Sequence, residues 1–458
     1  MSFEKEKHYI VNYLMNTVLG LGVKIENSYY DTRYQFLFGG KILEFKDDFF
    51  SRFENESVPY ICAENIPTKL FWFNASVGEN KRIPMIYGED VLICKRNYIY
   101  CGLDIFASSF FMLTRWEESV IPKKDRFGRC EESELFVVRH GIYDRPIVNE
   151  YIELIRSLLL HLEIPLPNID RHFTVYLTHD IDDLFRFASL NNFCRNIAGD
   201  ILHRKSVLTL IRTLKRYFLF RLGRIKDPFD TFDDLMDMSD HHGFKNAFYF
   251  KASFSDEYDA TYDIQDIRVK KIIDNILIRG HEVGFHPSKN TFHNPKQFEA
   301  ELQRLKELYP NIKGGRQHFL LYDIPFSLRV WNDVGLQYDA GLGFAFRAGF
   351  RCGICYEYPF FDVYEREQKE LVIRPLIVME GTLFANSEYQ TLQSIEDCMK
   401  RLAEIVCIYK GDYVFLWHND NFNRPETSRY GYIYNRIVKH LGSLCANVEN
   451  GCVDVDKN

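Results

Sequence analysis

The stretch FTVYLTHDID, residues 173–182, runs from an apolar, strand-like segment into two carboxylates. Asp180 and Asp182 are two positions apart, so on a strand both side chains would lie on the same face. Two carboxylates on one face repel each other unless a cation or a proton lies between them. A divalent metal would hold one as a ligand and leave the other to take a proton from water. Taken alone, the run fits equally well an acidic cap at a strand-to-helix turn.

Four further segments bring polar side chains close to apolar runs, in a fixed order along the chain. They are Gly280-His281-Glu282-Val283-Gly284-Phe285-His286, Arg316-Gln317-His318, Tyr338-Asp339 and Leu416-Trp417-His418-Asn419. A β/α barrel builds its active site in this way, from the carboxyl ends of its strands. The series therefore predicts metal-assisted hydrolysis, with a carboxylate as base and an imidazole as acid.

From His172 onward, strand-like runs alternate with segments of helical periodicity. We expect strands at 173–177, 247–251, 281–285, 336–339 and 413–417. We expect helices at 231–239, 269–279, 295–309, 325–334 and 395–409. Such alternation implies a parallel sheet, either open or closed into a barrel.

The chain has 458 residues, which is too long for a typical single domain. Residues 1–165 have a mixed α/β pattern without a dominant repeat, and 148–162 is their clearest helix. Pro165 and Pro167 then interrupt the pattern. We therefore expect an N-terminal mixed α/β domain of open role over 1–165, and a second domain over 171–458.

Charge and composition limit the function classes. The formal net charge of -7 argues against a dedicated nucleic-acid binder. The charged first residues are followed by no apolar signal segment, and no stretch is apolar enough to span a bilayer, so a cytoplasmic location is expected. The eleven cysteines are scattered, which fits reduced thiols. Cys352-Gly-Ile-Cys355 is a lone CxxC pair and is expected to be two unpaired thiols in a loop.

A basic insertion at 184–228 interrupts the alternation. Between Ile201 and Lys226 there is no Asp or Glu, and eight Lys and Arg residues are interleaved with Leu, Ile, Phe and Tyr. Such a helix can lie on an anionic membrane. It can equally be a helical lid on the barrel rim with solvated charges, and the sequence does not separate the two.

Strand parity separates the two histidines of 280–286. His281 and His286 are five positions apart, so on a strand they face opposite ways. His286 stands at the strand end, where a ligand belongs, whereas His281 is expected to be packed. Arg316 is a plausible partner for a carboxylate base, and His418 also follows an apolar run.

These segments together resemble the five motifs of the polysaccharide deacetylase family of carbohydrate esterases. The likeness covers about 173–423, and it is strongest in His281-Glu282-Val283-Gly284-Phe285-His286. More narrowly, the chain resembles a bacterial two-domain branch that has an uncharacterised N-terminal domain and is often found with surface-polysaccharide genes. The resemblance implies an irregular (β/α) barrel of seven strands.

The resemblance also implies roles for individual residues. Asp180 would be the general base and His418 the general acid, with Asp182 and His286 as ligands of Zn²⁺ or a similar divalent ion. Arg316 and Asp339 would position the base and acid groups.

The chain departs from the family pattern at two places. Ile181 separates aspartates that are adjacent in the family, so the roles of the two could be exchanged. Asn290 stands where the family has its third metal ligand, a histidine, and an amide oxygen is a poor zinc ligand. His293 and His318 are the other candidates, and His318 is preferred because it adjoins a matched motif.

The predicted function is removal of an N-acetyl group from a sugar in polysaccharide or glycan-precursor metabolism, by a metal-dependent hydrolase. The expected partner is an N-acetylated carbohydrate, with possible peripheral membrane contact through 201–226. Two alternatives stay open at this point. One is a C–N hydrolase acting on a small non-sugar amide, and the other is a non-catalytic glycan-binding or assembly protein.

Overall fold

The structure is a computed structural model of the chain, in which contacts group the residues into two compact units. The first unit comprises 1–172, 321–344 and 349–377, and the second comprises 173–320, 345–348 and 378–458. The residues described are 3–24, 29–30, 32–54, 59–75, 82–187, 193–194, 197–198, 207–253, 262–389, 391–423 and 430–449. Grouping by contacts does not define what folds alone. The division into domains 1–165 and 171–458 therefore stays a prediction.

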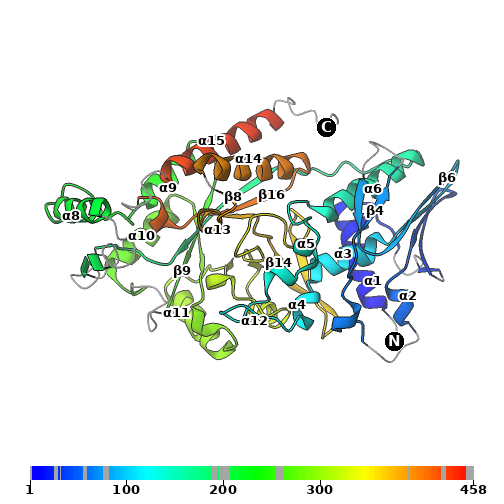
Figure 1. The fold of residues 1–458 in the computed structure, drawn as a ribbon, viewed down its shortest axis with the longest axis horizontal. Coiled ribbons are helices and arrows are strands. Elements are labelled where there is room, and N and C mark those ends of the chain that lie inside the picture. Colours follow the sequence, from blue (N-terminus) through cyan, green and yellow to red (C-terminus); the bar gives the residue numbers. More distant parts are fainter. Residues whose placement is uncertain are drawn as a thin grey trace. The chain divides into compact units, whose positions relative to one another are not determined.

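The first unit contains a mixed sheet whose described strands pair in the order β1-β2-β3-β7-β6. Strand β6 of this sheet is labelled in Figure 1. Its strands are β1 (Tyr29–Tyr30), β2 (Arg33–Phe38), β3 (Lys41–Lys46), β6 (Gly88–Lys95) and β7 (Tyr98–Leu103). Only β3 and β7 pair in parallel; the other neighbours are antiparallel. Gly39 and Gly40 form the turn between β2 and β3 with φ of 53° and 84°, a conformation that glycine adopts without a steric penalty.

Shorter strands complete the first unit. β4 (Phe71–Asn74) and β5 (Arg82–Met85) form an antiparallel pair. β14 (Glu367–Ile373) pairs in parallel with β12 (Tyr338–Asp339) and antiparallel with β13 (Tyr358–Asp362).

Helix α3 (Ile105–Thr114) lies at the centre of the first unit's core, because all of its residues are buried. Asp104 caps it by accepting a hydrogen bond from the backbone N of Ala107 at 2.9 Å. Helix α6 (Ile147–His161) confirms the clearest helix predicted from the sequence. The remaining helical segments are α1 (Glu4–Val11), the π-helical η1 (Asn12–Val18), α2 (Phe50–Phe53), η3 (Ala63–Asn65), α4 (Glu117–Val120), η4 (Glu132–Glu134), α5 (Phe136–Arg139) and α12 (Phe326–Asp333).

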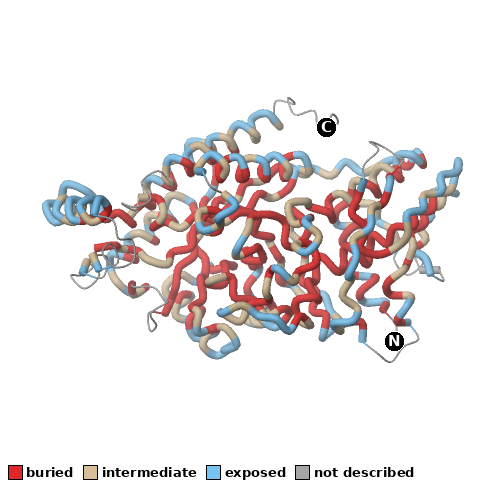
Figure 2. Tube along the Cα trace, viewed as in Figure 1, coloured by how far each residue is buried: buried red, intermediate tan, exposed pale blue. Residues whose placement is uncertain are grey.

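The second unit is built on a parallel sheet whose described strands pair in the order β11-β10-β9-β8-β16-β15. These strands are β8 (Thr174–Ile181), β9 (Asn246–Phe250), β10 (Glu282–Phe285), β11 (Gly314–Gly315), β15 (Val378–Met379) and β16 (Asp412–Leu416). Figure 2 shows β8, β9 and β16 as mostly buried. The predicted alternation of parallel strands and helices is confirmed, and the unit is α/β.

Helices accompany the strands of this sheet, and α10 and α14 contact β10 and β16. Asn294 caps α11 by accepting from the backbone N of Gln297 at 3.2 Å, and Pro295 opens the helix, as the sequence predicts. The helical segments are α8 (Val207–Arg221), α9 (Phe232–Asp240), α10 (Ile267–Ile278), η5 (Lys289–Thr291), α11 (Pro295–Leu308), η6 (His318–Leu320), α13 (Glu380–Ala385), α14 (Leu392–Ile408), η7 (Asn419–Asn421) and α15 (Tyr430–Glu449).

Two glycines allow the strands at one side of the parallel sheet to approach closely. A Cβ on Gly315 would lie 1.8 Å from the carbonyl oxygen of Phe285. A Cβ on Gly284 would lie 2.6 Å from the ring of Tyr249. Only glycine fits at these two positions, so β9, β10 and β11 keep the spacing that brings their carboxyl ends together.

Two other expectations concern the whole chain. Among the residues described, no helix has both the length and the apolar character needed to cross a membrane. Cys352 and Cys355 are buried in a loop and form no disulfide, as predicted for this CxxC pair.

Candidate functional site

The register of the parallel sheet aligns four polar residues in one row. Ile181 of β8 pairs with Phe250 of β9, Phe250 pairs with Phe285 of β10, and Phe285 pairs with Gly315 of β11. The residue after each of these positions leaves the sheet at its carboxyl edge. These next residues are Asp182, Lys251, His286 and Arg316.

Asp180 and Asp182 lie on the same face of β8, as the sequence predicts. Asp180 and Asp182 reach the same group of side chains, whereas His179 points to the other face. There its Nδ1 donates to the carbonyl oxygen of Trp417 at 2.7 Å, and its Nε2 lies 3.2 Å from Asn246 Oδ1. Burial lowers the pKa of His179 to about 4, against the effect of these bonds. His179 is therefore a neutral packing residue.

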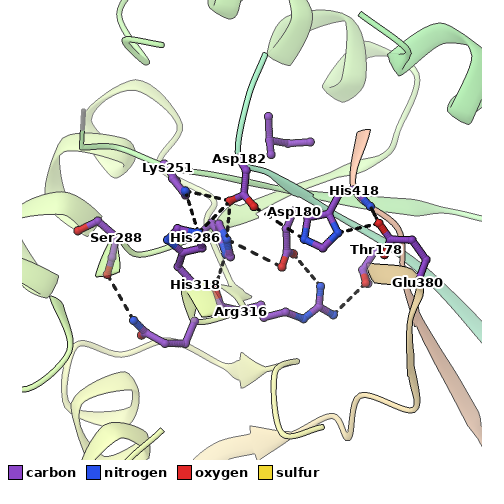
Figure 3. A network of polar contacts seen from close by, with 12 residues as sticks. Thr178, Asp180, Asp182, Lys251, His286, Ser288, Arg316, His318, Glu380 and His418 are labelled. Atoms are coloured by element: carbon purple, nitrogen blue, oxygen red, sulfur yellow. Dashed lines mark hydrogen bonds and ion pairs between the residues drawn. The ribbon is translucent and has the colours of Figure 1, made fainter. Parts of the chain in front are cut away.

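Asp182, His286 and His318 form a cluster that could hold a metal ion, because one ligand atom from each lies within 4.8 Å of the others. The Oδ1 atom of Asp182 is 3.4 Å from His286 Nε2 and 3.3 Å from His318 Nε2 (Figure 3). These are the three residues that the sequence analysis placed at a metal. Asn290 and His293, the other candidates for third ligand, are exposed, and His293 does not belong to this cluster.

His286 is held in the tautomer that a metal ligand needs. Its Nδ1 lies 2.6 Å from the carbonyl oxygen of Arg316. A carbonyl can only accept, so Nδ1 carries the proton and Nε2 keeps its lone pair. Nε2 is buried and makes no hydrogen bond within the described structure.

The separations of these donor atoms suit a small tetrahedral cation. With metal–nitrogen and metal–oxygen bonds of about 2.0–2.1 Å, two ligands at a tetrahedral angle lie about 3.3–3.4 Å apart. The two separations measured from Asp182 Oδ1 are 3.4 and 3.3 Å. The donor set of one carboxylate and two imidazoles therefore fits a divalent metal such as zinc.

Lys251 places an ammonium group against the same donor atoms. Its Nζ is 2.9 Å from Asp182 Oδ1 and 3.1 Å from His318 Nε2, and the side chain is 1% exposed. The sequence analysis did not single out this residue. The sequence pattern that could have found it was present. Lys251 directly follows the apolar run of β9, as the predicted ligands follow their own strands.

The charges around Asp182 decide its protonation state. Burial alone would raise the pKa of Asp182, but Lys251, His318 and His286 together hold it well below its usual range. Burial lowers the pKa of His318 well below its usual range, against the attraction of Asp182. An ionised carboxylate beside a neutral imidazole is the state in which both can act as ligands.

Asp180 is fixed by Arg316. Arg316 Nη1 donates to Asp180 Oδ1 at 2.7 Å, and Nη2 donates to Thr178 Oγ1 at 2.9 Å. The guanidinium is fully buried and lies over the ring of Tyr249, 5.1 Å from its centre. The other carboxylate oxygen, Oδ2, lies 3.9 Å from His286 Nε2. One oxygen of Asp180 is therefore anchored while the other faces the cluster.

His418 faces the cluster from the opposite side. Its Nε2 lies 3.8 Å from Asp182 Oδ2, and its Nδ1 lies 2.8 Å from Glu380 Oε1. Burial alone would lower the pKa of His418, but Glu380 and the two aspartates raise it to about 9. His418 therefore carries a proton at neutral pH.

Glu380 is the carboxylate that orients His418, and the sequence analysis missed it. Its Oε1 accepts from the backbone N of His418 and from Asn421 Nδ2, both at 2.8 Å. Burial would raise the pKa of Glu380, but His418 and Asn421 lower it below its usual value. Glu380 follows the short strand β15 as His418 follows β16, so both residues stand at strand ends.

Asp339 and His281 each have polar partners of their own. Asp339 belongs to the first unit, where it accepts from Tyr322 Oη at 2.5 Å and from the backbone N of Gly341 at 3.0 Å. His281 is buried, and its Nδ1 accepts from the backbone N of Asn246 at 3.2 Å. His281 is thus packed, as strand parity predicts.

The loops that carry His286 and His318 are supported by polar contacts. Ser288 Oγ donates to Glu301 Oε1 at 2.6 Å, and Gln317 Nε2 donates to Thr291 Oγ1 at 3.0 Å. Phe319, directly after His318, takes a left-handed backbone with φ of 56°. Such strain in a residue with a side chain costs about 1–3 kcal/mol and is concentrated at functional sites.

Comparisons with known proteins cover the chain unevenly. Residues 2–163, about a third of the chain, match the family described as "Family of unknown function (DUF7033)". Among curated proteins, none matches the chain. One similar solved structure is described as "Crystal structure of putative polysaccharide deacetylase from Mycobacterium smegmatis". It has a TM-score of 0.39 and 13% sequence identity, covering 61% of this chain and 87% of that chain. A likeness of that size carries no argument about activity.

Proposed function

We propose that the second unit is a metal-dependent hydrolase that removes an N-acetyl group from a sugar in polysaccharide or glycan-precursor metabolism. One observation carries the proposal: the metal-ligand cluster lies between an anchored carboxylate and a protonated imidazole. Asp180 approaches the cluster within 3.9 Å of His286, and His418 approaches it within 3.8 Å of Asp182. Metal-assisted hydrolysis of an amide uses these three elements, which are an electrophilic cation, a base and an acid.

The metal would be held by Asp182, His286 and His318, and we propose Zn²⁺ for this donor set. When bound, it would supply positive charge that polarises the amide carbonyl and eases deprotonation of water. The remaining chemistry falls to side chains of the chain itself.

Asp180 would take a proton from the attacking water at its Oδ2 atom. Its Oδ1 atom accepts from Arg316, so the carboxylate cannot rotate away from the cluster. Arg316 also donates to Thr178, which fixes the guanidinium at both ends. In this proposal Arg316 is a positioning residue, and Asp180 is the general base.

His418 would give a proton to the leaving sugar amine from its Nε2 atom. Glu380 Oε1 accepts a hydrogen bond from His418 Nδ1, and this bond orients the ring with Nε2 toward the cluster. The His418 pKa of about 9 keeps the imidazolium populated at neutral pH, so His418 can protonate the amine as it leaves. Acetate is then the second product.

The substrate class and the seven-stranded barrel are part of this proposal. The supporting observations are the motif order in the sequence and the parallel order of β11-β10-β9-β8-β16-β15. Polar side chains converge at the carboxyl ends of these strands, as they do in barrel enzymes. Asp339 is kept in its predicted role beside the catalytic groups on the strength of the motif order alone.

One observation favours an alternative, a non-catalytic glycan-binding protein that needs no metal. The Lys251 ammonium already lies at the point where the donors converge, 2.9 Å from Asp182. A buried ammonium can balance the charge of Asp182 without a metal ion.

The test is metal content by elemental analysis of the purified chain and of Asp182→Ala and His286→Ala. His293→Ala is the matched control, because His293 is an exposed histidine outside the cluster. We expect about one zinc per chain in wild type and in the control, and none in the two site variants. Acetate release from nucleotide-linked or lipid-linked N-acetyl sugars then tests the activity. No metal in wild type after incubation with excess zinc would reject the hydrolase and favour the binding protein.

A further inference from the structure

Helix α8 turns large apolar side chains toward solvent. Exposed fractions along α8 and the turn after it are Val207 72%, Leu208 58%, Ile211 56%, Leu214 46%, Phe218 63%, Leu222 53% and Ile225 36%. At about 100° per residue, Val207, Ile211, Leu214 and Phe218 fall within about 60° of the helix circumference. They form one apolar stripe along the helix. Figure 2 shows much of α8 in the colour of exposed residues.

The opposite side of α8, which faces the protein, carries threonines. Thr209 and Thr213 are buried, at 8% and 0% exposure. A helix that merely covers a protein surface buries its large apolar residues and exposes its polar ones. In α8 this pattern is reversed, so the lid interpretation does not account for the stripe.

The helix is nevertheless attached to the second unit. The ring of Tyr217 stacks on Phe193 with centroids 3.7 Å apart, and it contacts Phe187 at 5.4 Å. The Arg216 guanidinium donates to the carbonyl oxygen of Asn423. Tyr217 and Arg216, which make these contacts, lie outside the stripe. The stripe therefore stays exposed while α8 is attached to this unit.

Basic side chains border the stripe. Arg212 and Lys215 lie on one side of it by helical position, and Arg221 lies on the other; all three are exposed. No Asp or Glu occurs between residues 201 and 226. An apolar strip between cationic borders matches the chemistry of a bilayer surface, in which acyl chains lie beneath anionic headgroups.

We propose that α8 docks the protein on an anionic lipid bilayer. The apolar stripe enters the boundary between headgroups and acyl chains, and Arg212, Lys215 and Arg221 contact the headgroup phosphates. The inference does not depend on the proposed hydrolase activity, because docking needs neither the metal nor the sugar. A second copy of the chain would have to bring acidic residues to these cations, and its own α8 has none to offer.

The test is co-sedimentation of the full chain with vesicles of phosphatidylcholine, alone or with about one quarter phosphatidylglycerol. We expect at least about tenfold tighter binding to the anionic vesicles, and weaker binding as salt rises. Ile211→Gln with Phe218→Gln should lower this binding at least about tenfold. Arg212→Gln with Lys215→Gln should remove most of the preference for anionic lipid.

The matched control is Leu277→Gln with Ile278→Gln, an exposed apolar pair on α10 at 42% and 84% exposure. Its vesicle binding should equal that of wild type, and circular dichroism should show all variants folded. Absence of wild-type binding to the anionic vesicles, or equal binding by the stripe variant, would overturn the proposal. A dimer that the stripe variant dissociates, without vesicle binding by wild type, would also overturn it and assign the stripe to self-association.

Discussion

The two units each bury a cluster of charged side chains, and the clusters are built differently. In the first unit, Arg115 donates to Glu117 at 2.6 Å and to Glu118 at 2.9 Å, and Arg351 donates to Glu118 at 2.5 Å. Arg351 also donates to the carbonyl oxygen of Gly343 at 2.7 Å. Two cations and two anions thus cancel, with close hydrogen bonds between them.

In the second unit, nitrogen atoms converge on one carboxylate oxygen. Lys251, His318 and His286 lie 2.9, 3.3 and 3.4 Å from Asp182 Oδ1. His286 Nε2 is buried there without a hydrogen bond in the described structure. In the first cluster each carboxylate accepts from a guanidinium, whereas in the second the ligand atoms of Asp182, His286 and His318 converge on one point. Burial of charged groups therefore does not separate a structural cluster from a candidate metal site. The convergence of ligand atoms on one point does separate them.

The largest expected effect is the loss of metal from the second cluster. Asp182→Ala removes the one anionic ligand, so zinc content should fall to background and any amidase rate should fall roughly 10³-fold or more. Elemental analysis and acetate release measure the two effects, and circular dichroism should remain unchanged. If the variant keeps its zinc, the ligand assignment is wrong.

The matching change in the first cluster should affect stability instead. Glu118→Gln leaves Arg351 buried without an anionic partner and Arg115 with Glu117 alone, which should lower the free energy of unfolding by about 3–5 kcal/mol. Chemical denaturation measures this loss, while zinc per folded chain should stay the same. Glu134→Gln, in an exposed pair with Lys123, is the control and should change little. Equal stability in both variants would remove the distinction between the clusters.

The pair of His418 and Glu380 tests whether His418 stays protonated at neutral pH. The folded pKa of His418, about 9, lies above its unfolded value near 6.5. The stability from this proton is therefore fully present below about pH 6.5 and is lost as the pH rises through about 9. Glu380→Gln should lower the His418 pKa below about 9, because burial is then opposed by the two aspartates alone.

NMR titration of the histidine ring in metal-free protein measures this shift, and the alkaline limb of kcat/KM should move to lower pH with it. Glu388→Gln, which changes an exposed carboxylate of the same unit, is the control. A His418 pKa that stays near 9 in Glu380→Gln would show that the aspartates, and not Glu380, hold the proton.

Much of the second cluster could be predicted from local rules. Strand parity placed Asp180 and Asp182 on one face, and it separated His286 from His281. The strand-end rule could also have found Lys251 and Glu380, but β15 has only two residues and gives little pattern to read. The contact between Glu380 and His418 joins residues 38 positions apart, so no local pattern shows which carboxylate orients the imidazole.

The first unit was less accessible to sequence reasoning. Its mixed sheet inserts β7 between β3 and β6, a pairing that depends on contacts far apart in sequence. The Gly39-Gly40 turn between β2 and β3 was a hairpin signal that the sequence analysis did not use. The buried Arg351 also joins Glu118 over 233 positions, and a charge at 351 gives no sign of burial by itself.

The smallest expected effect is a change in zinc affinity when Lys251 is replaced. It shows whether the ammonium competes with a metal or takes its place. In the hydrolase, a metal must displace Lys251 from Asp182, so Lys251→Met should tighten zinc binding by about tenfold. Competition with a chromogenic chelator measures this affinity, and Lys245→Met, an exposed lysine just before the same strand, is the control. In a metal-free binding protein the ammonium is itself the resident cation. There Lys251→Met would leave Asp182 buried without a compensating charge, and the variant would unfold more easily and bind no zinc. The two clusters would then be alike, each neutralised by its own side chains.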